Sequence, residues 1–325
     1  MISRMLKIIW ALAPLALAAM EIMGLGQLLD SASAADAPNV ESIKMLATAE
    51  EIKLLRTAGV CPWNGRCVPD DDKSNQLELI AKKTEQWAPV PPKVTAAVVT
   101  SPPPSDAIVL FDGHGIDQWV SADDYTPARW PVKDGLLVVD KTLGNIETRQ
   151  RFKNYQLHLE WLVPKNINGE GQGRGNSGLF LASTGPGDQG YEIQILDSWE
   201  NPTYVNGQAA SVYKQYAPLV NASRPPGEWQ TYDVVWTAPI FGHPRGSLNT
   251  PAYVTLFHNG VLVQDHVRVK GETAFIGQPS YHAYDRAAVK LQSHHDPSFP
   301  PLSFRNIWIR ELPAVRAGEH TGEVH

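Results

Sequence analysis

Short runs in which apolar and polar residues alternate fill the chain from Asp106 to about Pro313. Alternation with a period of two is typical of strands, and the longer period of a helix is absent from this region. The pattern predicts ten strands: Ile108–Phe111, Leu136–Val139, Gln156–Val163, Ser177–Ala182, Tyr191–Leu196, Gln230–Thr237, Ala252–His258, Val261–Val269, Val289–Gln292 and Phe304–Glu311. So many short strands without helices between them predict an all-β fold, an antiparallel β-sandwich or jelly roll.

The most informative pair of strands lies between Gly173 and Asp197, where a glycine-rich loop joins them. In the second strand the alternation sends Glu192 and Gln194 to one face and apolar residues to the other. Asp197 joins the polar face only if a β-bulge at Ile195–Leu196 inserts one extra residue. A row of polar side chains on a sheet with a buried opposite face suits an extended ligand such as a sugar. The alternative is an ordinary half-buried strand whose polar side chains face water.

Small residues begin the first strand of this pair, where residues 175–178 read Gly-Asn-Ser-Gly. Small residues let a ligand approach the backbone closely, so we expect room for a ligand there. Further along the chain, Asn259-Gly260 lies between two apolar runs and predicts a tight β-hairpin turn.

The N-terminus has the parts of an export signal. Positive residues precede the apolar run Ile8–Ala19, and Ala32-Ser33-Ala34 fits a cleavage site before Ala35. We therefore expect residues 1–34 to be a signal peptide and the mature protein to be periplasmic or secreted. An uncleaved N-terminal anchor is the alternative. No later segment is apolar enough to cross a bilayer.

Residues 35–105 read as an extension of irregular and helical character rather than as a domain. Helical segments are predicted at Ser42–Ala58 and Gln76–Trp87, and the proline-rich linker Ala88–Ser105 is expected to pack poorly. The β-sandwich domain is then expected at residues 106–313, followed by a C-terminal tail at residues 314–325.

The two cysteines of the chain, Cys61 and Cys67, bracket a short loop in this extension. Disulfides persist in exported proteins, so we predict one bridge that fixes a local turn rather than the whole fold. A metal site is the rival interpretation, and the absence of an adjacent histidine weakens it.

The amino-acid composition favours some classes of binding partner over others. Ten Trp and ten Tyr favour strands and amphipathic ligands such as carbohydrates. The net charge of −6 and the lack of a basic stripe argue against nucleic acid as a partner.

Seven sequence blocks follow one another in an order typical of one family: FDG…W, NSGLFL, YEIQILDS, GEWQTYDVVW, VTLFHNGVLVQDH, LQSHHDP and FRNIWIREL. From Ile108 to Leu312 the chain resembles the 3-keto-disaccharide hydrolase domain family, formerly a domain of unknown function. The resemblance implies a concanavalin A-like jelly roll with a sugar-binding concave face. It also implies an enzyme that cleaves glycosides whose glucose ring is oxidised at carbon 3.

A ketone at carbon 3 acidifies the C2–H bond, so a base can remove that proton, the leaving group at carbon 1 can be eliminated, and water can add afterwards. Direct hydrolysis by two carboxylates is the other route. Glu192 is the first candidate for the acid or base, and His294 and Asp197 are the further catalytic candidates. The spacing Glu-x-Gln-x-x-Asp resembles the Glu-x-Asp-x-x-Glu row of laminarinase-type endoglucanases, but the changed acids argue against their retaining mechanism.

Six other residues are candidates for substrate binding, each weighed against a purely structural role: Gln194, Arg174, Asn176, Tyr213, Lys214 and Trp199. Gln194 would bond sugar hydroxyls, Arg174, Asn176 or Lys214 would donate to the 3-oxygen, and aromatic rings would stack on the sugar. No residue is assigned as a metal ligand. Binding of a divalent metal such as calcium remains an alternative, either at the Asp112-Gly113 turn or beside the paired histidines His294 and His295.

Two other functions compete with the enzyme. A non-catalytic, lectin-like carbohydrate-binding module would use the same fold and similar polar groups. A structural protein of the cell envelope would use the proline-rich linker as a tether, and the polar row at Glu192 and Gln194 argues against it.

Overall fold

The computed structural model describes residues 81–93, 102–242, 246–294 and 301–313. The chain divides into two compact units, residues 1–75 and 76–325, and every described residue belongs to the second. The predicted signal peptide, the predicted disulfide between Cys61 and Cys67 and the C-terminal tail lie outside the described residues.

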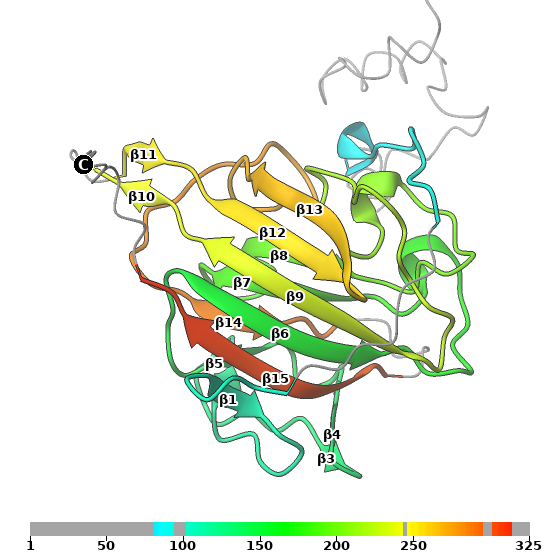
Figure 1. The fold of residues 1–325 in the computed structure, drawn as a ribbon, viewed down its shortest axis with the longest axis horizontal. Coiled ribbons are helices and arrows are strands. Elements are labelled where there is room, and N and C mark those ends of the chain that lie inside the picture. Colours follow the sequence, from blue (N-terminus) through cyan, green and yellow to red (C-terminus); the bar gives the residue numbers. More distant parts are fainter. Residues whose placement is uncertain (1–80, 94–101, 243–245, 295–300, 314–325) are drawn as a thin grey trace, which may run out of the picture. The chain divides into compact units, whose positions relative to one another are not determined.

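An eight-stranded antiparallel sheet forms one layer of the domain, in the order β13-β12-β9-β6-β15-β4-β3 with β1 also paired to β15. Its strands are β1 (Ile108–Phe111), β3 (Val132–Lys133), β4 (Leu136–Val138), β6 (Tyr155–Leu162), β9 (Trp229–Thr237), β12 (Tyr253–His258), β13 (Val261–Arg268) and β15 (Ser303–Glu311). A five-stranded antiparallel sheet, β2-β5-β14-β7-β8, forms the other layer and lies behind the first in Figure 1.

The five-stranded sheet consists of β2 (Trp119–Ser121), β5 (Ile146–Thr148), β7 (Ser177–Ser183), β8 (Gly190–Ile195) and β14 (Ala288–Leu291). A small hairpin, β10 (Ile240–Phe241) and β11 (Leu248–Thr250), is separate from both sheets. The helical elements of the described residues are three single turns of 3-10 helix, η1 (Lys82–Thr84), η2 (Gly171–Gly173) and η3 (Val205–Gly207).

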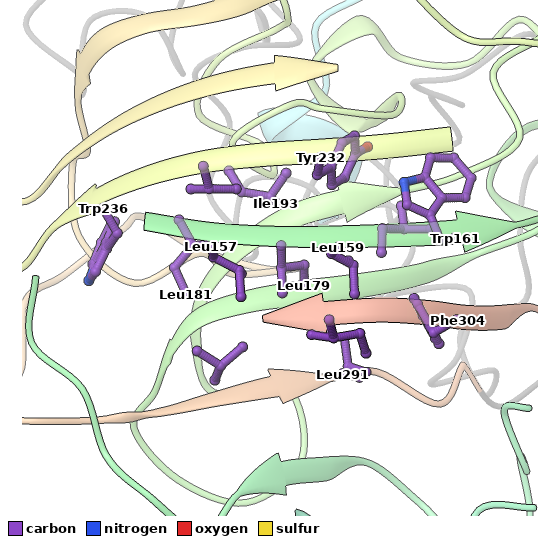
Figure 2. Close-up of a cluster of buried hydrophobic side chains, with 14 of the residues drawn as sticks. Leu157, Leu159, Trp161, Leu179, Leu181, Ile193, Tyr232, Trp236, Leu291 and Phe304 are labelled. Carbon is purple, nitrogen blue, oxygen red and sulfur yellow. The ribbon is translucent and has the colours of Figure 1, made fainter. Parts of the chain in front are cut away.

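The hydrophobic core fills the space between the two sheets (Figure 2). Leu157 and Leu159 of β6 and Val234 of β9 face Leu179 of β7 and Ile193 of β8, and all five are at most 1% exposed. Alternate residues of each strand point into this space, which is why the period-two pattern marked the strands. The antiparallel sandwich predicted from the sequence is confirmed.

Every one of the ten predicted strands is present, with each end within one residue of its predicted position. The Asn259-Gly260 hairpin joins β12 to β13 as predicted, and both residues have the positive φ that this turn requires, 53° and 77°. Five of the six described strands of two or three residues were missed, because so short a run rarely shows a period: β2, β3, β5, β10 and β11.

The bulge at Ile195–Leu196 that would bring Asp197 to the polar face does not form. The ladder between β7 and β8 stays regular up to the pair Ser177 and Ile195, where β8 ends, and the irregularity lies near the other end, between Phe180 and Ser183 of β7. Leu196 and Asp197 belong to the following loop. Asp197 is nevertheless buried, because an arginine pairs with it there.

Residues 81–93 pack against the domain, although the sequence assigns them to a helical segment and a loose linker. Of the helical segment predicted at Gln76–Trp87, residues 76–80 lie outside the described chain, and the described part contains one turn of 3-10 helix, η1. Beyond it, the Asn221 N–H donates to the Pro92 carbonyl at 2.8 Å, and the Lys93 ammonium lies 3.0 Å from the centre of the Trp199 ring. Prolines favour extended chain, and here the extended chain runs along the domain, cyan in Figure 1.

Candidate active site

A cleft of about 660 Å³ lies against the face of the five-stranded sheet that is turned away from the core. Glu192 and Gln194 of β8 and Gln292 and His294, which follow β14, contribute to its lining. The rest of the lining comes from three groups of residues: 81–87, the loops at 171–176 and 202–213, and Asp188, Thr273 and Phe275. The polar face predicted for β8 is therefore the side of a cleft rather than open surface.

Glu192 is buried to 5% exposure, and a glycine on the neighbouring strand makes the space for it. A Cβ on Gly178 would overlap Oε1 of Glu192 and lie 3.0 Å from its Cδ. We expected the small residues at 175–178 to leave room for a ligand. The structure corrects this at Gly178, because the space above it is filled by the carboxyl group of Glu192.

Burial raises the pKa of the Glu192 carboxyl well above its usual value, the charge of Asp188 raises it further, and the Lys290 ammonium opposes both. Among the described residues, none donates a hydrogen bond to this carboxyl. A buried carboxyl group without donors holds a proton more tightly than one in water, which suits a group that transfers protons.

Two tyrosines stand next to Glu192. The Tyr213 N–H donates to the backbone carbonyl of Glu192 at 3.1 Å, and the hydroxyl oxygens of Tyr204 and Tyr213 are 2.9 Å apart. Burial is the main cause that raises the pKa of both phenols, so both stay neutral near pH 7. One hydroxyl donates to the other, and the accepting hydroxyl keeps its own proton for a ligand.

Amide groups form the other polar surface of the cleft. Gln194 Nε2 donates to Gln172 Oε1 at 2.8 Å, and Asn176 Nδ2 donates to the Gln172 carbonyl at 2.9 Å. The side-chain oxygens of Gln194 and Gln292 are buried and accept no hydrogen bond from the part of the chain that the structure describes. Buried acceptors of this kind need a donor, and the hydroxyl groups of a bound sugar would supply one.

A buried lysine fixes the loop that carries Asp188. Lys290 of β14 is 0% exposed, and its ammonium donates to the carbonyls of Gly185, Gly187 and Gln189 at 2.7, 2.8 and 3.0 Å. The three accepting carbonyls lie on both sides of Asp188 in the sequence, so these hydrogen bonds hold Asp188 at the cleft. Lys290 was missed in the sequence because a lone lysine in a strand usually faces water.

Asp197, Arg174 and Trp199 do not line the cleft, in contrast to their predicted roles. Arg174 Nε pairs with Asp197 Oδ2 at 2.7 Å, and the same guanidinium donates to the Trp199 carbonyl. Asp197 Oδ1 accepts the Trp199 N–H at 3.1 Å. Burial raises the pKa of Asp197, and Arg174 counters that effect. The three residues therefore hold together the loop that follows β8.

Lys214 also lies outside the cleft lining, although we predicted it as a donor to the 3-oxygen. Its ammonium donates to the carbonyls of Ala81 and Phe275 at 2.7 and 2.9 Å, two residues that do line the cleft. Burial lowers the pKa of Lys214 to about 8, against the opposing charge of Glu85. Lys214 therefore positions two walls of the cleft.

Five of the nine predicted site residues thus come together: Glu192, Gln194, Asn176, Tyr213 and His294. The other residues of the lining carried no sequence signal strong enough to find them. Tyr204 and Thr203 lie in a loop without a motif, and Gln172 precedes the glycine-flanked strand that drew attention. Only the fold shows that these loops meet over β8.

No group of three or more His, Cys, Asp or Glu side chains among the described residues is arranged to hold a metal ion. The Asp112 carboxylate accepts the His114 N–H at 3.1 Å in an exposed turn, and His295 and Asp296 lie outside the described residues. In the same part of the chain, no helix is long and apolar enough to cross a membrane.

Comparison with known proteins places this geometry in a family. Residues 106–310 match the model of the 3-keto-alpha-glucoside-1,2-lyase-like domain. The chain belongs to this family. The matched region confirms the family resemblance seen in the sequence blocks, and its limits lie within two residues of those of the resemblance.

Relatives of this lyase-like domain carry names from carbohydrate chemistry. A 3-keto-disaccharide hydrolase of Bacteroides thetaiotaomicron is 27% identical over 175 residues, 45% of this chain and 58% of that protein. The chain therefore spans less than two thirds of that relative.

Two solved structures from Parabacteroides distasonis are described as candidate glycosyl hydrolases. One is 47% identical, with a TM-score of 0.61, and the match covers 71% of this chain and 96% of that one. The other is 19% identical, with a TM-score of 0.48 over 64% of this chain and 94% of that one. The family, the Bacteroides relative and the 47% identical structure together support the expectation of a carbohydrate-active enzyme of the glycoside-hydrolase type.

Proposed function

We propose that this protein cleaves 3-keto-glucosides by eliminating the leaving group at carbon 1 and then adding water. The family description and the name of the Bacteroides relative support the substrate class. The observation that carries the proposal is the Glu192 carboxyl, buried in a sugar-sized cleft with a raised pKa and with no donor among the described residues. An envelope protein with a purely structural role has no need of such a costly group.

Glu192 acts as the base. In its ionised form the carboxylate is destabilised by burial, so it gains stability when it takes the proton from C2. The electron pair of the C2–H bond passes into the ring, where the carbonyl at carbon 3 accepts it as an enolate. The free hydroxyl proton of the Tyr204–Tyr213 pair and the amide of Asn176 are the nearby donors that stabilise its oxygen.

The bond between C1 and the glycosidic oxygen then breaks, and the enolate collapses to a C1–C2 double bond while the ketone re-forms. The departing oxygen takes a proton, which we assign to His294 because a protonated imidazole donates an N–H and this one lines the cleft. Water then adds across the double bond: its hydroxyl bonds to C1, its proton restores His294, and C2 takes a proton from the Glu192 carboxyl after that carboxyl has exchanged its proton with solvent. The sum is hydrolysis, and no oxidant or metal is consumed.

The test is release of the leaving group from methyl 3-keto-α-glucoside in heavy water by wild type and by Glu192→Gln. Elimination followed by hydration places deuterium on C2 of the released sugar, whereas direct hydrolysis leaves C2 unlabelled. A parallel incubation of the free 3-keto sugar without enzyme measures the spontaneous exchange that must be subtracted. Wild-type release without excess C2 label rejects the elimination route, and binding without release favours a lectin-like module.

A further inference from the structure

Residues of the N-terminal segment line the cleft although they lie outside the family domain. The domain match begins at residue 106, yet Ala81, Lys82, Glu85 and Trp87 contribute side chains or backbone to the cleft wall. A chain restricted to the matched domain would therefore have a more open cleft. Residues 81–87, which precede the family domain, are therefore part of the site.

Buried groups of the domain hold this segment in place. Asn206 is 0% exposed, and its side chain bonds the segment twice: Oδ1 accepts the Gln86 N–H at 2.9 Å, and Nδ2 donates to the Thr84 carbonyl at 2.9 Å. The Val205 N–H donates to the Gln86 carbonyl, and the Lys214 ammonium donates to that of Ala81. Buried side chains devoted to a neighbouring backbone indicate a fixed wall rather than a passing linker.

Trp87 is an aromatic ring at the open edge of this wall. Its side chain is 59% exposed, and its Nε1 donates to Glu85 Oε2 at 3.2 Å, which fixes the orientation of the indole. Its ring centre lies 6.4 Å from that of Tyr204 in an edge contact, and Tyr204 in turn lies 6.4 Å from Tyr213. The aromatic row thus runs from solvent to the residue that donates a hydrogen bond to the backbone of Glu192.

We propose that Trp87 and Glu85 form the subsite for the leaving group, and that this leaving group is a sugar ring. This inference rests on the proposed function, which places C2 of the oxidised ring at Glu192. The leaving group is bonded to the adjacent carbon, so it extends along the aromatic row toward the edge of the cleft. The apolar face of a pyranose stacks on the indole, and a carboxylate beside it accepts hydroxyl protons.

The experiment compares two substrates that differ only in the leaving group: methyl 3-keto-α-glucoside and a disaccharide whose α-linked glucose is oxidised at carbon 3. The variants are Trp87→Ala, Trp87→Phe, which keeps an aromatic face, and Phe257→Ala. Phe257 is a control because it is a partly exposed aromatic of β12, in the other sheet and outside the cleft lining. We measure kcat/KM for both substrates with each protein.

For Trp87→Ala the ratio of kcat/KM for the disaccharide to that for the methyl glycoside should fall about tenfold, as expected for one lost stacking contact. Trp87→Phe should recover most of the ratio, and Phe257→Ala should leave it unchanged. An unchanged ratio in Trp87→Ala overturns the subsite. The chemistry at Glu192 is not questioned by that result, because both substrates would still be cleaved.

Binding separates this inference from the proposed function. We titrate the same disaccharide into Glu192→Gln and into the double variant with Trp87→Ala by calorimetry. A dissociation constant about tenfold weaker in the double variant supports the subsite even if the wild type cleaves neither substrate. Equal dissociation constants, or no binding to either protein, reject it.

Discussion

The carboxyl group of Glu192 lies directly over Gly178, in a space that exists only because Gly178 has no side chain. The two residues belong to neighbouring strands, β8 and β7, and their relative position is fixed by the ladder that pairs them. The backbone at Gly178 has no positive φ, so alanine would be tolerated there apart from the overlap with Glu192.

Gly178→Ala should therefore displace the carboxyl group and leave the sandwich folded. Misplacement of a catalytic group by about 1 Å can cost about a hundredfold in rate, so we expect kcat to fall by that order with a smaller change in KM. The control is Gly115→Ala, because a Cβ there meets only Asp117 Oδ2 at an ordinary 3.6 Å. Wild-type kcat in Gly178→Ala would mean that the position of the Glu192 carboxyl does not limit the reaction.

Glu192 should make the protein less stable as the pH rises. Its pKa is raised in the folded protein, so above the unfolded value of 4.5 the unfolded chain releases a proton that the folded chain retains. The stability contribution is therefore full below about pH 4.5 and is lost as the pH rises toward the folded pKa. We expect Glu192→Gln to have a higher Tm than wild type at pH 8 and nearly the same Tm at pH 4.

The activity of the wild type should rise with pH, whereas its stability falls. A base must be ionised, so kcat/KM of the wild type should rise with pH through the raised pKa of Glu192. A measured profile of kcat/KM from pH 5 to 9 tests this. If kcat/KM falls over the range in which Glu192 ionises, Glu192 is an acid rather than the base that takes the C2 proton.

The ion pair between Arg174 and Asp197 should matter for stability more than for catalysis. Asp197 is 3% exposed, and Arg174→Met would leave its carboxylate buried without a cationic partner. Loss of one partner of a buried pair costs about 3 kcal/mol of unfolding free energy, which denaturant titration can measure. The double variant Arg174→Met/Asp197→Leu should recover part of that loss.

A catalytic role of Arg174 would give a different result. In that case the folded Arg174→Met protein would lose kcat as severely as Glu192→Gln. The double variant would recover stability without any activity.

The fold was largely predictable from the sequence because the sandwich buries alternate residues of every long strand. Ile193 and Leu179 face the core while Glu192 and Gly178 face away, and this alternation can be read from the order of residues in the sequence. Most strands of two or three residues, such as β10, show no clear period and were not found. Their positions depend on pairing with partners distant in the sequence.

The cleft was predictable only in part, for a related reason. The face of β8 that carries Glu192 follows from alternation, but the loops that cover it do not. Asp197 and Arg174 are polar residues beside that strand, and the sequence cannot distinguish a pair that binds a ligand from a pair that binds each other. Trp87 lies before the recognisable domain, and only its contacts bring it to the site.

The last prediction concerns a buried ionic cluster on the other sheet. His158 of β6 is 1% exposed, and its Nδ1 lies 2.7 Å from Asp233 Oδ1, with Nε2 3.5 Å from Glu160 Oε1. Burial lowers the pKa of His158, but the hydrogen bond to Asp233 and the negative charges of Asp233 and Glu160 outweigh it and raise the pKa to about 9. The ring also stacks on Trp308 at 5.3 Å.

The charge on His158 should therefore stabilise the protein below about pH 9, with its full effect below about pH 6.5. A raised pKa contributes full stability below the unfolded value of 6.5, and that contribution is lost as the pH rises through about 9. His158→Gln should cost on the order of 3 kcal/mol more at pH 6 than at pH 9.5, since each pKa unit is worth about 1.4 kcal/mol. Denaturant unfolding of both proteins at the two pH values checks this. A pH-independent difference would show that His158 acts through packing on Trp308 and not through its charge.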